Sequence, residues 1–240
     1  GLEEPPKHEK INSKNYFLID KINKLDKWIE EAEEFGEVAV DTETNSLDPN
    51  QAELVGISLS TKIGKACYVP IGHKSKKCLS KELVIKKLKP LLEDPSIKKI
   101  GQNIKFDFIV LFHHGINMSS MEDTMLMSYV LDAGKNRHNM DTLSEIHLGH
   151  KPIAFKDLVG SGKKQLNFSE VEIDKAKDYA AEDADITLRL YEILSRRVSE
   201  EKLDKIYDVF EKPMIKILSK LETAGIKVDD VYLKKLSKKS

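Results

Sequence analysis

Two carboxylates separated by one residue, Asp41 and Glu43, follow the apolar run 38–40. In a β-strand, side chains at i and i+2 project from the same face, so both would project together at the carboxyl end of a buried strand. Two adjacent negative charges repel one another, and a divalent cation relieves that repulsion. The pair therefore predicts part of a metal site.

Two segments further along the chain supply candidate partners. Asp107 lies four residues after Asn103, where a short strand runs into a helix, and Tyr179 lies four residues before Asp183 in a segment of helical character. Residues four apart share one face of a helix. The predicted set is four carboxylates with one phenol a turn before the last of them: Asp41, Glu43, Asp107, Asp183 and Tyr179.

Oxygen-only ligation favours magnesium or manganese, whereas zinc normally takes nitrogen or sulfur from His or Cys. Four carboxylates are enough for two such ions. Two ions about 3.5–4 Å apart promote displacement at phosphorus, one by activating water and the other by stabilising the leaving oxygen. The pattern thus predicts metal-assisted phosphodiester hydrolysis, in which Tyr179 would orient the attacking water without ionising.

Hydrophobic periodicity predicts an α/β domain with a mixed sheet flanked by helices. The two strands after the carboxylate pair should form an antiparallel meander, and helices should dominate after residue 101. The expected helices are 24–35 and 81–92, and the expected strands are 37–42, 54–60, 66–71 and 98–101.

Three motifs in this order resemble the proofreading 3'-5' exonuclease domain of bacterial DNA polymerase I. They are DTETNSLD from Asp41, GQNIKFD from Gly101 and YAAEDAD from Tyr179, and the resemblance extends from about Asn15 to the C-terminus. It implies a ribonuclease H-like fold and hydrolysis of the 3'-terminal phosphodiester of single-stranded or frayed DNA, with release of nucleoside 5'-monophosphates.

The resemblance also implies how the metal ligands are shared. Asp41, Glu43 and Asp183 would hold the ion that activates water, and Asp41 and Asp107 would hold a second ion at the leaving 3' oxygen. Asp185, although it belongs to the third motif, departs from the helix face of Tyr179 and Asp183 and is expected outside the site.

Five further residues acquire substrate-binding roles from the resemblance alone. Leu47 would wedge beside the terminal base and Phe155 would stack near it, a contact that tolerates any base. Gln102 and Asn103 would lie near the scissile end, and Arg137 would contact the terminal phosphate, which a guanidinium can bind bidentately.

The expected domain organisation is a linker or tag remnant over residues 1–14, the exonuclease domain over 15–200 and the truncated beginning of a polymerase domain over 201–240. A long amphipathic helix is expected at 201–223. The chain would then be a fragment whose parent is a DNA-directed DNA polymerase, with the rest of that chain and a DNA primer terminus as its partners.

Composition does not by itself indicate a nucleic-acid-binding protein, because 39 basic and 40 acidic residues give a net charge of −1. Cys67 and Cys78 have neither zinc-ligand nor disulfide spacing and predict reduced thiols in a cytoplasmic protein. No apolar run is long enough for a membrane span, and nothing requires more than a monomer. His138 lies in a polar stretch and is interpreted as a surface residue.

Three alternative functions are weighed against the exonuclease. One is a ribonuclease D-like enzyme that acts on RNA 3' ends, against which the polymerase-like segment argues. A catalytically silent scaffold that holds DNA is disfavoured because all four carboxylates and Tyr179 are present. A calcium-binding structural domain lacks the clustered loop ligands of a dedicated calcium site.

Overall fold

A six-stranded mixed sheet forms the centre of the protein, whose computed structural model describes residues 8–208, 220, 223 and 224. The strand order is β1-β4-β3-β2-β5-β6. Strand β3 runs antiparallel to both β2 and β4, while the pairs β1/β4, β2/β5 and β5/β6 are parallel. The strands are β1 (Tyr16–Leu18), β2 (Glu37–Thr44), β3 (Leu54–Lys62), β4 (Lys65–Pro70), β5 (Lys98–Gly101) and β6 (Met121–Asp123).

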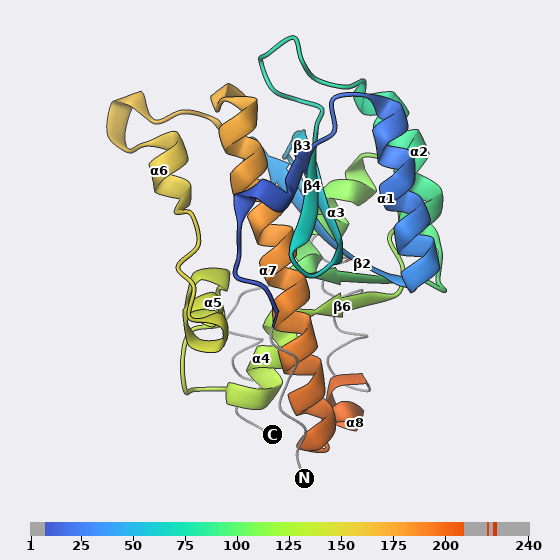
Figure 1. The fold of residues 1–240 in the computed structure, drawn as a ribbon, viewed down its shortest axis with the longest axis vertical. Helices are drawn as coiled ribbons and strands as arrows, with labels where there is room; N and C mark the ends of the chain where they lie inside the picture. The colour runs from blue at the N-terminus through green and yellow to red at the C-terminus, as the bar shows by residue number, and fades with distance from the viewer. Residues whose placement is uncertain (1–7, 209–219, 221–222, 225–240) are drawn as a thin grey trace.

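Helices cover both faces of this sheet. Helices α1 and α2 lie side by side on one face, and the long α7 crosses the other (Figure 1). The helices are α1 (Ile22–Phe35), α2 (Lys81–Glu93), α3 (Ile104–His113), α4 (Thr124–Asp132), α5 (Met140–Leu148), α6 (Phe155–Val159), α7 (Ile173–Glu200) and α8 (Asp204–Ile206). Short 3-10 turns are η1 (Ser13–Asn15), η2 (Gly162–Lys164) and η3 (Phe168–Glu170). The predicted α/β class is confirmed.

The alternation along β2 determines which way its carboxylates point. Val38 and Val40 are buried in the main core with residues of α1 and α2, whereas Ala39 packs with Leu188 of α7. Since successive strand residues alternate between faces, Asp41 continues the face of Ala39. The sheet therefore presents Asp41 toward α7.

Helix α7 is fixed to the sheet by a buried carboxylate. Asp185 accepts hydrogen bonds from the Tyr16 hydroxyl at 2.7 Å, the Gly64 N–H at 2.8 Å and the Arg189 Nε at 3.0 Å. These donors come from β1, the β3–β4 turn and the next turn of α7. Asp185 thus serves the fold, in agreement with its expected place outside the site.

Several element boundaries differ from the expected ones. Strand β2 continues to Thr44 instead of ending at residue 42, because β3 keeps pairing with it through Glu43 and Gly56 before the register shifts. Antiparallel pairing and the meander are as expected. Of the helix expected at 201–223, the described part contains a turn at 201–202 and α8, and most of the remainder lies outside the described residues.

Residues near both ends of the described chain pack against the domain. His8 lies 2.9 Å from the Glu192 carboxylate of α7, so part of the expected linker contacts the fold. Tyr207 is 3 % exposed, and its hydroxyl accepts a hydrogen bond from the Asp123 N–H at 2.9 Å. Among the described residues, no helix combines the length and apolar character needed to cross a membrane.

Candidate metal centre and nucleic-acid groove

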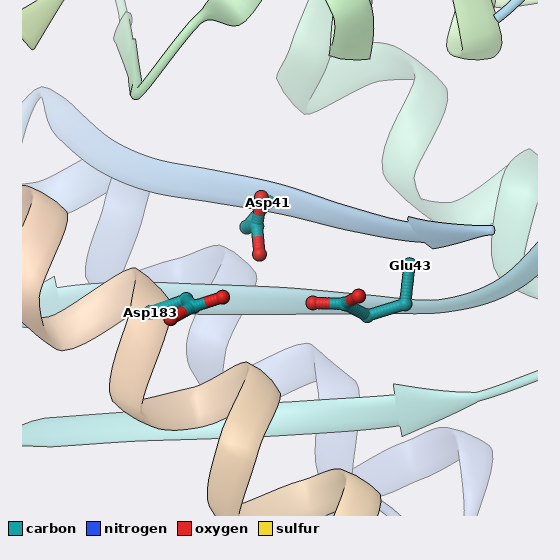
Figure 2. Close-up of side chains that lie close together, drawn as sticks. All are labelled: Asp41, Glu43 and Asp183. Carbon is teal, nitrogen blue, oxygen red and sulfur yellow. The ribbon is translucent and has the colours of Figure 1, made fainter. Parts of the chain in front are cut away.

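Three of the four predicted carboxylates converge on one point. Asp41, Glu43 and Asp183 each offer one oxygen, and these oxygens lie within 4.8 Å of one another. Figure 2 shows Asp183 reaching from α7 toward the two carboxylates of β2. The strand alternation brings Asp41 and Glu43 to this face, and the anchored α7 supplies the third ligand.

The fourth carboxylate, Asp107 in the first turn of α3, lies beside this cluster and is tied to the same strand. It accepts hydrogen bonds from the Thr42 N–H at 3.0 Å and the Thr42 hydroxyl at 2.6 Å. Thr42 is the residue between Asp41 and Glu43, so it fixes Asp107 next to the pair from the other face of β2. The charge of Asp41 acts on Asp107 in turn.

The electrostatics of the site oppose ionisation of all four carboxyl groups. Burial raises the pKa of Asp41 to about 6. Burial, followed by repulsion from Asp41, raises the pKa values of Glu43, Asp107 and Asp183 well above their usual range. Buried all-oxygen donor sets with mutually repelling charges fit hard divalent cations. The residues present therefore fit magnesium or manganese.

The start of α3, which carries Asp107, is held by a residue that sequence reasoning missed. Asp123, at the end of β6, accepts hydrogen bonds from the N–H groups of Asn103 at 2.8 Å and Met125 at 3.2 Å, so one carboxylate caps both α3 and α4. Burial raises the pKa of Asp123 to about 7. An acid at the end of a strand just before a helix was the available signal.

A groove of about 490 Å³ opens beside the carboxylate cluster. Its lining includes Glu43 of the cluster, Tyr179 of α7 and the two residues expected to contact a base, Leu47 and Phe155. Leu47 is 94 % exposed and Phe155 is 42 % exposed. An exposed aromatic ring such as that of Phe155 offers a surface on which an unpaired base can stack.

Tyr179 faces both the groove and the cluster. Burial, together with the charge of Asp183, raises the pKa of its phenol. The hydroxyl therefore stays protonated at neutral pH and keeps a proton to donate. Its ring lies 5.9 Å from that of Phe155 and 6.1 Å from that of Phe168.

The three remaining predicted substrate residues are not among the described residues that line this groove. The Gln102 side chain connects the start of α4 with the segment before α5. It donates to the His138 carbonyl at 2.8 Å and accepts from the Thr124 hydroxyl. Asn103 caps α3 with a left-handed backbone at φ 59°. Arg137 is exposed in the connection between α4 and α5.

The surface interpretation of His138 is wrong. This residue is 7 % exposed, its Nδ1 lies 2.6 Å from the Ser128 hydroxyl, and its ring packs 4.0 Å from that of Tyr129. A polar local sequence misled the prediction, because the chain folds back after α4 and the ring packs against Ser128 and Tyr129 of that helix. His138 is a buried structural residue.

A mixed sheet with a carboxylate cluster at the carboxyl end of β2 and an apolar groove beside it is the arrangement expected of a metal-dependent nuclease. The 3'-5' exonuclease family matches this chain over residues 16–199, and the chain belongs to that metal-dependent family. The chain is 45 % identical over 243 residues to DNA polymerase I of Rhizobium leguminosarum. This alignment covers 92 % of the chain and 24 % of that protein.

Solved structures agree with this placement. Brucella melitensis NrnC bound to pGG has a TM-score of 0.66 at 25 % identity, over 88 % of this chain and 93 % of that one. RNase D of Escherichia coli, described as an exoribonuclease involved in structured RNA processing, has a TM-score of 0.60 at 16 % identity, over 90 % and 52 %. The latter likeness concerns the fold alone. The chain is a 3'-5' exonuclease domain of the DNA polymerase I type. It spans about a quarter of the length of the Rhizobium leguminosarum polymerase.

Proposed function

We propose that this domain removes nucleotides from the 3' end of single-stranded or frayed DNA and releases nucleoside 5'-monophosphates. It would act as the proofreading part of a DNA-directed DNA polymerase. The observation that carries the proposal is the convergence of three carboxylates, Glu43 buried and Asp41 and Asp183 partly buried, next to a groove with exposed apolar walls. The similarity to DNA polymerase I favours DNA as the substrate.

The four carboxylates would hold two divalent cations, Mg²⁺ or Mn²⁺. Asp41, Glu43 and Asp183 form the first ligand set, supported by their mutual proximity. Asp41 and Asp107 form the second, supported by the hydrogen bonds that tie Asp107 to β2. Ions bound in this way promote attack by water and stabilise the leaving oxygen.

The protein's own side chains orient the reactants. The protonated phenol of Tyr179 would hydrogen-bond the attacking water and aim it at the terminal phosphorus, because it lies on the same face of α7 as Asp183. Leu47 and Phe155 would hold the terminal base between apolar surfaces. Stacking of this kind is worth about 1–3 kcal/mol per base and does not depend on base identity.

Polar contacts outside the groove complete the proposed substrate site. Gln102 and Asn103, which lie at the junction of β5 and α3, would stay near the scissile end, and Arg137 would reach the terminal phosphate from its exposed loop. We further propose that the domain works as a monomer in the cytoplasm, attached to the rest of a polymerase chain that begins within 201–240.

The first test is digestion of a 5'-labelled single-stranded oligonucleotide with magnesium, with manganese and with a chelator. Asp41→Ala, which removes a ligand of both proposed ions, should abolish shortening while the far-ultraviolet spectrum stays native. Asp48→Ala is the matched control, because Asp48 is an exposed carboxylate of the following loop. Comparable shortening by the Asp41→Ala protein would exclude the mechanism.

The two main alternatives are separated by the same assay. An RNA oligonucleotide of equal length and sequence tests the ribonuclease D-like activity, whose support here is shared fold. Binding of the DNA without metal-dependent shortening would instead favour a scaffold. The retained carboxylates and the buried, metal-compatible arrangement support the enzyme.

A further inference from the structure

A buried aromatic residue, Phe168 in η3, lines the groove between Phe155 and Tyr179. It is 2 % exposed and stacks almost parallel to Phe155, with ring centroids 6.2 Å apart and an interplanar angle of 11°. Its ring also lies 6.1 Å from that of Tyr179. One side chain therefore contacts the ring proposed to touch the base and the ring proposed to orient water.

His73 packs against Phe168 and is not among the described residues that line the groove. The two rings are 5.8 Å apart, and His73 is buried between the sheet and η3. Its Nδ1 lies 3.2 Å from the Val171 carbonyl oxygen, which can only accept, so Nδ1 carries a proton. Burial lowers the pKa of His73, which leaves Nε2 free to accept from the Tyr68 hydroxyl at 2.6 Å.

Tyr68, on β4, extends these contacts across the sheet toward β2, which carries Asp41 and Glu43. It pairs with Ser58 across the sheet, and Ser58 in turn pairs with Asp41. The Tyr68 hydroxyl occupies the space where Gly56 has no side chain, and Gly56 is the cross-strand partner of Glu43. The His73–Tyr68 pair thus links η3 to the strand region that carries the metal ligands.

The backbone of η3 is held from two further directions. The Lys74 N–H donates to the Ser169 carbonyl at 2.9 Å, and the Asn167 side-chain amide donates to the Asn45 carbonyl at 3.2 Å. Asn45 belongs to the loop that carries Leu47. Hydrogen bonds therefore connect η3 to the loop after β4 and to the loop after β2, and the second of these loops lines the groove.

We propose that Phe168, supported by His73, is a positioning residue that sets the placement of the Tyr179 hydroxyl and of the Phe155 ring. The contacts to both rings carry the inference, because each ring has an exposed or reactive edge and needs a fixed back wall to hold one orientation. This inference rests on the proposed function, since it acts through the roles assigned there to Tyr179 and Phe155.

The test is a pair of double-mutant cycles on the whole chain. Phe168→Leu should lower the single-turnover rate on a single-stranded oligonucleotide about tenfold in the parent protein and less than about twofold in a Tyr179→Phe background. The second cycle combines Phe168→Leu with Phe155→Ala and measures oligonucleotide binding in the presence of chelator. Coupling is expected there as well.

Two controls separate positioning from loss of stability. Trp28→Leu removes a buried aromatic ring of α1 on the other face of the sheet, and it should lower the melting temperature without coupling to Tyr179→Phe. His73→Leu should behave as Phe168→Leu does, whereas His73→Asn should recover part of the rate, because its amide can still donate to the Val171 carbonyl.

The outcomes distinguish this inference from the proposed function. Equal effects of Phe168→Leu in both backgrounds of both cycles would overturn the positioning role. If Tyr179→Phe has no effect on the rate, the role proposed for Tyr179 fails, and the Phe155 binding cycle alone decides the inference. Absence of any nuclease activity would contradict the proposed function while leaving that binding cycle measurable.

Discussion

At the scale of single residues, three carboxylates within four positions of α7 have three different environments. Glu182 accepts a hydrogen bond from the Ile153 N–H at 2.7 Å and so holds the segment before α6. Asp183 joins the carboxylate cluster with Asp41 and Glu43, and Asp185 accepts a hydrogen bond from the β3–β4 turn. A helix turns about 100° per residue, which separates these directions although the residues are neighbours.

Replacing Asp183 by Asn should have opposite effects on stability and activity. In metal-free protein at neutral pH, the substitution replaces a carboxyl group whose ionisation is opposed by burial and by the charge of Asp41, and we expect a gain of about 1 kcal/mol in the free energy of unfolding. Activity should fall at least about a hundredfold, because a metal ligand is lost. Urea unfolding in chelator and the oligonucleotide assay measure the two effects, and a less stable metal-free variant would contradict the repulsion.

The Thr42 hydroxyl is expected to matter through Asp107. Thr42→Val keeps the shape of the side chain but removes the donor that lies 2.6 Å from the Asp107 carboxylate. We expect kcat to fall roughly tenfold, as for other groups that orient a metal ligand. Thr61→Val is the control. It removes a β3 hydroxyl that donates to Glu31 of α1, and it should keep full activity.

At the scale of elements, the site depends on how α7 and α3 are attached to the sheet. Asp185 and Arg189 form a buried ion pair on α7 at 3.0 Å, and the same carboxylate binds β1 and the β3–β4 turn. Asp123 holds the start of α3 in a comparable way. Each helix thus has a buried acid near the point where it delivers a metal ligand.

Breaking the attachment of α7 should be costly. Asp185→Asn leaves Arg189 without its charged partner, and removal of one member of a buried ion pair typically costs about 3–5 kcal/mol. Urea unfolding at pH 7 measures this loss. Asp174→Asn, in the exposed first turn of the same helix, should cost less than about 1 kcal/mol, and an equal loss in both variants would show that Asp185 has no special role.

At the scale of the whole molecule, the sheet topology brings distant segments together. Strands β2, β5 and β6 are parallel, so their carboxyl ends lie at the same end of the sheet. That end carries Glu43, the start of α3 after Gly101, and Asp123. The remaining ligand comes from α7 on the far side of the groove, so a complete site requires the complete fold.

Metal dependence of stability follows from the raised pKa values. Carboxyl groups whose pKa values are raised in the folded state favour folding when protonated, and that contribution is lost as pH rises from about 4 through the pKa of Asp41 at about 6. Metal-free protein should therefore lose stability over this range. A magnesium concentration about a hundred times the dissociation constant at pH 7.5 should raise the free energy of unfolding by about 2.7 kcal/mol at that pH. The same concentration should raise it less at about pH 5, because protonated carboxyl groups bind the ion more weakly.

Calorimetric scans with and without magnesium at both pH values measure this effect. In the Asp41→Ala protein, both the fall in stability with pH and the gain from magnesium should be smaller, since this variant lacks a central carboxylate of the cluster. A magnesium effect that is equal at both pH values, or unchanged in Asp41→Ala, would contradict a carboxylate-held cation.

Local sequence was enough to predict the fold class, most strands and the convergence of Asp41, Glu43 and Asp183. Alternation along 37–44 placed Asp41 and Glu43 on one face, and the i, i+4 spacing placed Tyr179 with Asp183. These predictions depend on the repeat of a strand or a helix, which a few adjacent residues determine. The separation of Asp185 from the site followed from the same geometry.

Contacts between distant segments decided the rest. The hydrogen bonds between Thr42 and Asp107 join residues 65 positions apart, and the local sequence around either residue gives no sign of the other. Asp123 also holds Asn103, 20 positions away, and the polar stretch around His138 gives no sign that its ring is buried. The groove between Leu47 and Phe155 likewise combines the loop after β2 with the start of α6, more than a hundred positions further along the chain. Such features arise only when packing selects one arrangement of the elements, because hydrogen bonding and burial depend on distance in space and not along the chain.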